Sequence, residues 1–458
     1  MVNNIGFAGL KTYLQNFLNT GHERSSRAKK NILFSFIVKG LSIAISLVLV
    51  PLTIHYVNAD RYGIWLTLSS IVGWLTFFDV GLGNGLRNKL AEAVAKGETD
   101  LAKIYVSTTY AILGIIIGAV LLIFFALNPF LNWSGILNAP PAMKSELSLL
   151  ALIVFTFFCI QFLLQLLTTI MTANQEPAKA SFFSFLGSLL SLIIIYILTK
   201  TTHGSLVLLG TAFSAAPVFV LLVSSLWYFR RSYRQFAPSF KFIKFKYARD
   251  LMVLGIKFFV LQVAAIVIYQ TSNIIIAQLF GPAQVTPYNI AYKYFSVITM
   301  VMGIVIMPFW SAFTEAWTKK DLNWIKNAIR NLKIIWALLS VLTIIMLIFS
   351  NLIYRLWVGK GIIVPFSLSA IIAAYVIIFS WNNIYINFLN GVGIIKLQLY
   401  SGIWGMVLNV PMAIFFCKHY GIIGVMIPTV ILGGINMIWS VIQYNKVINF
   451  KARGIWAS

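Results

Sequence analysis

Residues 77 to 93 read FFDVGLGNGLRNKLAEA, and they join a long apolar segment to a polar one. The run from Ile64 to Phe78 carries no charge, whereas Asp79 follows it directly and Arg87 comes eight residues later. An uncharged run of this kind is typical of a helix that crosses a membrane. The stretch therefore predicts the end of a membrane-spanning helix, where an acid, several glycines and an arginine approach the aqueous phase.

Glycines and charges are spaced along this stretch as on a helix. Gly81 and Gly85 have the spacing that lets two membrane helices approach closely. Asp79 and Arg87 fall on roughly the same helix face. The phrase AEAVAK (91–96) recurs in similar form as TEAWTK (314–319), 223 residues later. The residues predicted to act in gating or coupling are Asp79, Arg87, Glu92 and Glu315. In the competing interpretation, Asp79 only caps its helix or pairs with Arg87 or Lys89.

The composition is that of a membrane protein. Of the 458 residues, 60% are hydrophobic and only 10% are charged, and the mean hydropathy is +0.88. These values lie outside the range of soluble globular domains. Thirty-five Lys and Arg against 11 Asp and Glu give a formal net charge of +24. Because the basic residues are spread over many loops, the charge predicts no nucleic-acid binding.

Twelve apolar segments are long enough to cross the hydrocarbon core of a bilayer. The sequence therefore predicts an all-α, polytopic membrane protein. Before the first segment, the apolar residues of 1–30 fall on one helix face, which predicts an interfacial helix rather than a cleaved signal. The predicted spans are 31–57, 62–84, 103–130, 147–172, 179–199, 205–228, 251–281, 286–312, 331–357, 365–390, 395–417 and 421–445.

The distribution of Lys and Arg predicts the orientation. Twenty-six of the 35 fall on the side that holds both termini, six fall on the opposite side and three lie within spans. Both termini are therefore expected in the cytoplasm. A basic loop divides the spans six and six, as in a transporter built from two parallel repeats. The predicted parts are a cytoplasmic amphipathic segment (1–30), an N-terminal lobe (31–229), a basic linker (230–250), a C-terminal lobe (251–446) and a cytoplasmic tail (447–458).

Motifs for catalysis or cofactor binding are missing from the sequence. None of the four His has a Cys or acid nearby at metal-ligand spacing. The GLGNG run follows a membrane segment rather than a strand, and no GxxxxGK[ST] motif occurs. We therefore predict no catalytic residue, no metal site and no cofactor. Energy for transport would come from an ion gradient, the membrane potential or a downhill substrate.

Four charged residues lie inside the predicted spans, where each costs roughly 2.5 to 3.5 kcal/mol at a helix centre. Three are lysines, at positions 39, 257 and 293, and the fourth is Asp79. This positive bias suits an anionic cargo, because ammonium groups in a low-dielectric cleft pair with it at close range. For Lys39 and Lys257, the competing interpretation is that each ammonium extends to the headgroups along a lipid-embedded stem. Lys293 lies deeper.

The seventh span adds uncharged polar side chains along one broad helical stripe. We predict that this stripe lines a cleft between the lobes, and hydrogen bonding between helices is the competing interpretation. Trp381, Asn382 and Asn383 would extend the same cleft. The predicted substrate-binding residues are Lys39, Lys257, Lys293, Gln262, Gln270 and Asn273.

The run DVGLGNGLRNKLAEA (79–93) resembles the signature of the polysaccharide transport family, the O-antigen and oligosaccharide flippases of the multidrug/oligosaccharidyl-lipid/polysaccharide exporter superfamily. The likeness extends over most of the chain. It implies a MATE-like fold of twelve helices in two six-helix lobes, working by alternating access. It also implies that an undecaprenyl-pyrophosphate-linked oligosaccharide is moved across the bacterial inner membrane for surface polysaccharide biosynthesis. The implied partners are this lipid-linked oligosaccharide, the bilayer, H⁺ or Na⁺ as coupling ion, and a polysaccharide polymerase.

Two other functions stay open. A cation-coupled multidrug exporter of the same superfamily would carry acids in its first lobe, where Asp79 is the available acid within a span. A membrane-embedded glycan polymerase or ligase would need a large external loop for its acceptor. The longest predicted external loop is the stretch near 131–146.

Overall fold

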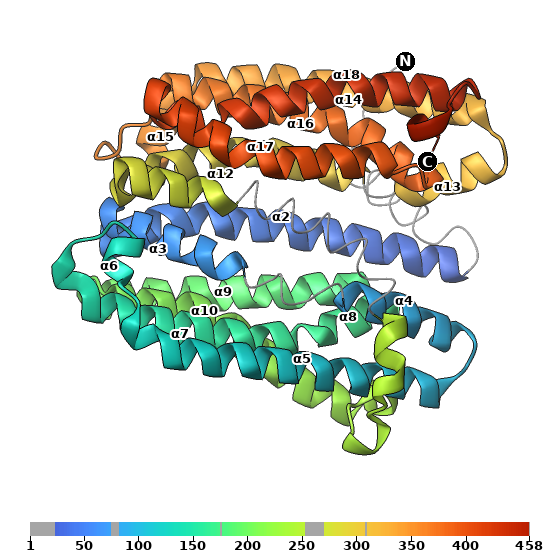
Figure 1. Ribbon diagram of the computed structural model, residues 1–458, viewed down its shortest axis with the longest axis horizontal. Helices are drawn as coiled ribbons and strands as arrows, with labels where there is room; N and C mark the ends of the chain where they lie inside the picture. Colours follow the sequence, from blue (N-terminus) through green and yellow to red (C-terminus); the bar gives the residue numbers. More distant parts are fainter. Residues whose placement is uncertain (1–22, 75–81, 175, 252–269, 307–308, 458) are drawn as a thin grey trace, which may run out of the picture.

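The computed structural model describes residues 23–74, 82–174, 176–251, 270–306 and 309–457, which are helical and contain no β-strand. Two groups of long helices lie side by side (Figure 1). The first group contains α2 (Glu23–Val57), α3 (Ala59–Gly73), α4 (Leu82–Ala95), α5 (Thr99–Leu127), α6 (Trp133–Ile136), α7 (Lys144–Leu164), α8 (Leu166–Ala173), α9 (Pro177–Thr201) and α10 (Leu206–Arg230). The second contains the helical segment 270–280, α12 (Val285–Ile306), α13 (Phe309–Thr318), α14 (Leu322–Ile348), α15 (Ser350–Val358), α16 (Phe366–Val392), α17 (Lys396–Tyr420) and α18 (Ile427–Ile448).

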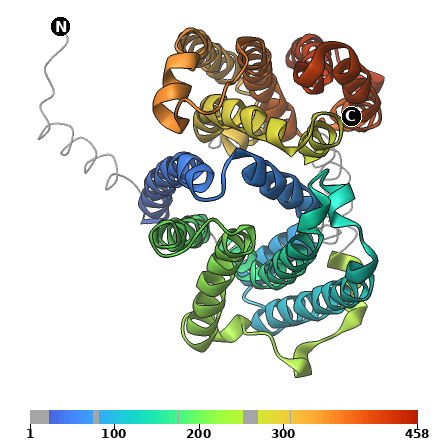
Figure 2. The same ribbon diagram turned by 90° about the vertical axis from the view of Figure 1, so that its left-hand side faces the viewer.

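The connections gather at two ends because successive long helices run in opposite directions. We name the end that carries α6, α15 and the short 3-10 helix η7 (Pro282–Gln284) the α6 end. The opposite end carries α4, α13 and the linker 231–250, and we name it the linker end (Figure 1). Figure 2 looks at the α6 end and shows α2 and α3 lying between the remaining helices of the two groups.

The predicted fold class is confirmed. Ten helices of the described chain are long and apolar enough to cross a membrane, and each coincides with one predicted span. The other two predicted spans, 62–84 and 251–281, each include residues outside the described ranges. The chain is a multi-pass membrane protein.

Several helices begin at a side chain that caps their free N–H groups. The Asn58 side chain accepts a hydrogen bond from the Arg61 N–H at 3.0 Å, at the start of α3. Asp321 accepts one from the Trp324 N–H at 3.0 Å, at the start of α14. Such caps satisfy donors that have no partner inside the helix, so these polar residues fix where the two helices begin.

Two predicted spans run through residues outside the described ranges. Of the span 62–84, the structure describes α3, which ends at Gly73, and the start of α4 at Leu82. Of the span 286–312, it describes α12, which ends at Ile306, and the start of α13 at Phe309. The two similar phrases AEAVAK and TEAWTK lie at the ends of α4 and α13.

Gly85 allows a close approach between the α4 backbone and the end of the linker. A Cβ added at Gly85 would lie 2.0 Å from the carbonyl oxygen of Leu251. Real Cβ atoms do not come so close to backbone, so the position requires glycine. The close packing predicted for Gly85 is confirmed, and Gly81 lies outside the described residues.

The described core residues form three clusters. One cluster joins both groups at the α6 end, and it includes Leu68 of α3, Leu150 of α7, Ile290 of α12 and Ile372 of α16. A second belongs to the linker end of the first group, around Leu86 and Leu167. A third belongs to the linker end of the second group, around Phe313 and Phe388. The groups thus share one core at the α6 end and have separate cores at the linker end.

The outward faces of the long helices are apolar. Ile115 and Leu122 of α5 are 62% and 70% exposed, and Leu338 and Val341 of α14 are 66% and 56% exposed. Water would disfavour so much exposed aliphatic surface, whereas lipid tails accommodate it. These faces therefore mark the lipid-contacting sides of the two groups.

Candidate functional site at the junction of the helix groups

At the α6 end, α3 packs directly against η7 because Gly63 has no side chain. A Cβ at Gly63 would lie 1.8 Å from the carbonyl oxygen of Pro282. Beside this contact, the Thr286 hydroxyl donates a hydrogen bond to the Ala59 carbonyl at 2.6 Å. The closeness of the two groups here thus depends on a glycine in one group and a proline carbonyl in the other.

Side-chain amides add further hydrogen bonds across the same end. Asn138 donates from Nδ2 to the Ala277 carbonyl at 2.9 Å. Gln278 donates from Nε2 to the carbonyls of Ile136 and Gly135, at 2.5 and 3.2 Å. Each bond contributes only about 0.5 to 1.5 kcal/mol. Together they stabilise the contact between the two helix groups, although each bond alone is weak enough to break.

Deeper along the helices, polar side chains from both groups meet. Asn273 donates from Nδ2 to the Ser70 hydroxyl oxygen of α3 at 2.8 Å. Asn289 of α12 donates from Nδ2 to the Asn273 Oδ1, also at 2.8 Å. The Gln270 side chain lies against Gly73, whose added Cβ would be 3.2 Å from the Gln270 Nε2. These contacts join α3, the segment 270–280 and α12 in one polar patch.

Lys293 lies one helical turn beyond Asn289, so the two residues share a face of α12. Ring packing fixes the rotation of α12 about its axis. The Tyr292 ring packs on Tyr288 of the same helix and on Tyr375 of α16, with centroid distances of 6.0 and 6.3 Å. Lys293 is half-buried. No described residue forms an ion pair with its ammonium. We name Ser70, Gln270, Asn273, Asn289 and Lys293 the junction cluster.

The junction cluster lies well inside the molecule, away from the α6 end. Ser70 is eleven residues from the start of α3, and Lys293 is eight residues from the start of α12. At a rise of 1.5 Å per residue, these positions are about 16 and 12 Å from the α6 end. A hydrocarbon core is about 30 Å thick, so the cluster lies near its middle.

Three of the six predicted substrate-binding residues, Gln270, Asn273 and Lys293, therefore lie in one place. Lys39 lies half-buried in α2, 18 residues before the end of that helix at the α6 end. Lys257 and Gln262 lie outside the described residues. Sequence reasoning missed Ser70 and Asn289. The signal for Asn289 was its position four residues before Lys293 on the same helix.

The predicted gating residues lie elsewhere. Arg87 and Glu92 are exposed on α4, and Glu92 pairs with Lys96 at 2.7 Å and with Lys89 at 3.1 Å. Hydrogen bonds from Lys96 and Lys89, together with their charges, hold the pKa of Glu92 below its usual range. Asp79 lies outside the described residues, and so does the side chain of Glu315 in α13. A gating or coupling role for these four residues stays a prediction.

Trp381 and Asn382 pack inside the second group. The Trp381 ring meets Trp336 of α14 with a centroid distance of 4.6 Å, and Asn382 donates a hydrogen bond to the Gly433 carbonyl of α18 at 2.9 Å. These contacts hold α14, α16 and α18 together. They do not extend the junction cluster.

Sequence comparison shows the family of this chain. The sequence pattern described as polysaccharide biosynthesis protein matches residues 28–314, and the pattern described as MatE matches residues 259–415. The chain belongs to the polysaccharide biosynthesis protein family. Its match begins within α2 and ends within α13, so it includes the residues of the junction cluster.

The chain is also similar to named relatives in sequence and to solved structures in fold. The chain is 21% identical over 399 residues to a protein from Yersinia pseudotuberculosis named as an O-antigen export protein, covering 84% of this chain and 88% of the relative. It is 20% identical over 420 residues to a Salmonella typhi protein named as an O-antigen transporter, covering 90% and 94%. An inward-facing multidrug resistance MATE transporter has a similar fold, with a TM-score of 0.67 at 15% identity, over 92% of this chain and 96% of that one.

Proposed function

We propose that this member of the polysaccharide biosynthesis protein family is a flippase for lipid-linked oligosaccharide, working by alternating access between its two helix groups. The observation that carries the proposal is the position of Lys293, a lysine without an ion-pair partner among the described residues. It lies near mid-membrane, one helical turn from Asn289, which belongs to a patch of polar side chains from both groups. The names of the relatives indicate the cargo class.

The junction cluster suits an anionic glycolipid. The Lys293 ammonium would pair with a phosphate of the lipid carrier, for which undecaprenyl pyrophosphate is the proposed form. The amides of Gln270, Asn273 and Asn289 would exchange their present hydrogen bonds for bonds to sugar hydroxyls. Because amides both donate and accept, the exchange leaves few buried polar groups unpaired.

The distribution of charge gives the proposed orientation. The linker end carries most of the Lys and Arg, so we place it, and both termini, in the cytoplasm of a bacterium with the helices in the inner membrane. The described conformation, closed at the α6 end, is then the one that accepts cargo from the cytoplasmic side. Release on the periplasmic side would require the contacts at Gly63, Asn138 and Gln278 to separate.

We propose that the two groups move as the N-terminal lobe (31–229) and the C-terminal lobe (251–446), with the basic linker 230–250 between them. Coupling to H⁺ or Na⁺, and handover of the cargo to a polysaccharide polymerase, are further parts of this proposal. They rest on the resemblance of residues 79–93 to the polysaccharide transport family. Catalysis has no part in it.

A cation-coupled multidrug exporter is the second candidate, since solved MATE transporters share the fold. It would need an acid near the cargo. Within the described residues, Asp and Glu occur only near helix ends and in loops, and the junction cluster contains none. A lysine in that place repels cations, so the geometry favours the flippase.

Complementation tests the proposal. In a strain that lacks the gene, wild-type protein should restore surface polysaccharide and clear lipid-linked oligosaccharide from the cytoplasmic leaflet. Lys293→Ala should reduce transport more than about tenfold, which corresponds to about 1.4 kcal/mol, because the charge pair with phosphate is lost. Lys293→Arg should retain part of the activity.

The matched control is Lys360→Ala, which removes an exposed lysine from the α6 end. It should transport as the wild type does. Normal export by Lys293→Ala, at equal abundance, would contradict the proposed role of the junction cluster. Intact surface polysaccharide in the deletion strain, with altered resistance to cationic dyes, would favour the multidrug exporter instead.

A further inference from the structure

The linker 231–250 is fixed to the first helix group by its backbone and by buried rings. The Ser239 N–H donates to the Ser107 hydroxyl oxygen at 3.1 Å, and the Lys244 N–H donates to the Thr108 hydroxyl oxygen at 3.0 Å. Tyr233 and Phe236 are buried in the core at this end, 3% and 2% exposed. The linker is therefore an ordered element of the surface, and its outward side chains have defined positions.

The same element turns aromatic rings outward between basic residues. Residues 240–247 read FKFIKFKY, and two short 3-10 helices, η5 (Phe240–Phe242) and η6 (Phe245–Tyr247), order them. Phe242 packs inward, with the Lys103 ammonium 4.7 Å from its ring centroid. This leaves Phe240 93% exposed and Phe245 55% exposed. A fixed and almost fully exposed phenylalanine is unfavourable in water, so a partner that covers it would stabilise this arrangement.

The charge of the linker indicates what that partner is. Its only acid is Asp250, and its exposed basic residues are Arg231, Arg234, Lys241, Lys244, Lys246 and Arg249. A partner that meets both the rings and these charges combines apolar and anionic chemistry. The outer boundary of an anionic bilayer leaflet does so, because acyl chains lie directly beneath negative headgroups.

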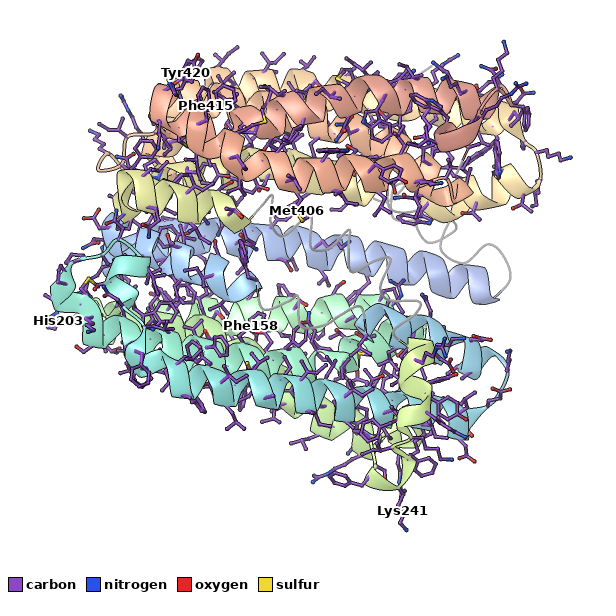
Figure 3. The ribbon with its side chains drawn as sticks, viewed as in Figure 1. Phe158, His203, Lys241, Met406, Phe415 and Tyr420 are labelled. Atoms are coloured by element: carbon purple, nitrogen blue, oxygen red, sulfur yellow. The ribbon has the colours of Figure 1, made fainter. Side chains whose placement is uncertain are left out.

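The position of the linker fits this boundary. Just before it, Trp227 at the end of α10 is 55% exposed and carries the Arg231 guanidinium 3.9 Å from its ring centroid. Tryptophan is enriched at the level of the headgroups. The linker extends sideways from the first group at the linker end, away from the second group (Figure 1). Lys241 lies at its tip and points away from the helices (Figure 3).

We propose that the linker is a membrane-surface anchor that binds anionic phospholipid headgroups of the leaflet at the linker end. Phe240 and Phe245 enter the headgroup region, and Lys241, Lys244 and Lys246 contact the phosphates. The anchor would hold the inner edge of the first helix group at a fixed depth while the second group moves. The proposal does not depend on which cargo the protein carries.

Fluorescence at position 240 tests the placement. The native cysteines, Cys159 and Cys417, are buried and free, so both are replaced by alanine before Phe240→Cys is introduced and labelled with an environment-sensitive dye. In vesicles of phosphatidylcholine and phosphatidylglycerol, lipids with a shallow quencher should quench this label. The control label at Lys320→Cys, on an exposed turn at the same end, should not be quenched.

Equal behaviour of the labels at 240 and 320 would overturn the placement. Quenching that is as strong in pure phosphatidylcholine would overturn the role of the charges. A signal that changes with protein concentration would assign the surface to a second copy of the chain instead, which also overturns the proposal.

Lipid retention tests the charges without any label. The variant Lys241→Gln, Lys244→Gln, Lys246→Gln, purified from the mixed vesicles, should retain less than about half the phosphatidylglycerol that the wild type retains. The matched control, Lys320→Gln, Lys326→Gln, Arg330→Gln, removes three exposed charges from the same end and should retain the wild-type amount. Equal retention by both variants would contradict the proposal.

Discussion

The two ends of the molecule join its helix groups in different ways. At the α6 end, one hydrophobic core runs through both groups, and Gly63 brings α3 against the Pro282 carbonyl. At the linker end, each group has a core of its own, around Leu86 in the first and Phe388 in the second. The difference separates two kinds of contact. Contacts within each core hold one helix group together, whereas contacts across the α6 end hold the two groups in the present conformation.

The contacts across the α6 end can be broken one at a time. The bonds across the α6 end come from single amides and hydroxyls, such as those of Asn138 and Thr286. Contacts within a group, such as Gly85 against Leu251, involve close backbone packing inside a core. We therefore expect substitutions at the α6 end to change the balance of conformations, and those within a group to change stability.

The largest effect is expected for Gly63→Leu. Any side chain there meets the Pro282 carbonyl, and overpacking of this kind costs about 1 to 3 kcal/mol, so the α6 end should stay open. Transport should fall more than about tenfold while the protein still inserts. The opening can be measured as the rate at which Thr67→Cys, buried in α3 one helical turn beyond Gly63 in the wild type, reacts with a maleimide.

Gly118→Leu is the matched control for Gly63→Leu. Gly118 lies in α5 with no atom within 4 Å of an added Cβ. It should transport normally and leave position 67 protected. Protection of position 67 in Gly63→Leu would show that the α6 end closes without this glycine.

Gly85→Val should act on stability instead. Its Cβ would lie 2.0 Å from the carbonyl of Leu251, which is part of the first group's core, so the strain, again about 1 to 3 kcal/mol, falls within that core rather than on a contact at the α6 end. We expect a lower unfolding temperature in detergent and less folded protein, with unchanged reactivity at position 67. If position 67 became more reactive while the unfolding temperature stayed at the wild-type value, contacts within a core and contacts across the α6 end would not differ in their effects.

Asn273→Ala should have a moderate effect. It removes the hydrogen bonds to Ser70 and Asn289, each contributing about 0.5 to 1.5 kcal/mol. The reactivity of position 67 should rise by up to about tenfold. A double-mutant cycle with Ser70→Ala separates the two bonds. Additive effects of the two substitutions would contradict a direct bond between these side chains.

Glu92→Gln should have the smallest effect. Glu92 is exposed on α4, and an exposed ion pair contributes little, so transport should change by less than about twofold. Because the pKa of Glu92 is lowered in the folded protein, its contribution is present at neutral pH and is lost as pH falls through the lowered pKa. The unfolding temperatures of the variant and the wild type should therefore converge in acid.

A larger effect of Glu92→Gln that also changes the pH dependence of transport would indicate coupling. It would then place a functional residue at the linker end. In that case the two ends would differ in function as well, because residues at the linker end would take part in coupling while the α6 end would only open and close.

The sequence was sufficient to predict the fold class and part of the site. Span length and charge distribution predicted the helices because lipid imposes both. Lys293 was predicted because a charge in a span is costly, and the structure places it one helical turn from Asn289, which bonds to Asn273.

The rest depended on how distant segments meet. The bond from Asn273 to Ser70 spans 203 residues, and nothing local in either segment indicates the partner. Trp381 and Asn382 have side chains that suit a cleft, but Trp381 packs against α14 and Asn382 bonds to α18.

The most direct test of the account measures both ends in the same molecules. Spin labels at Lys144→Cys and Gln284→Cys report on the α6 end, and labels at Asn88→Cys and Lys320→Cys report on the linker end, all at exposed positions. Each pair is measured in reconstituted protein without the native cysteines, before and after lipid-linked oligosaccharide is supplied. The account predicts that the distance at the α6 end lengthens in the same fraction of molecules in which the distance at the linker end shortens. Transport with an unchanged distance at the α6 end, or with both distances changing in the same direction, would contradict it.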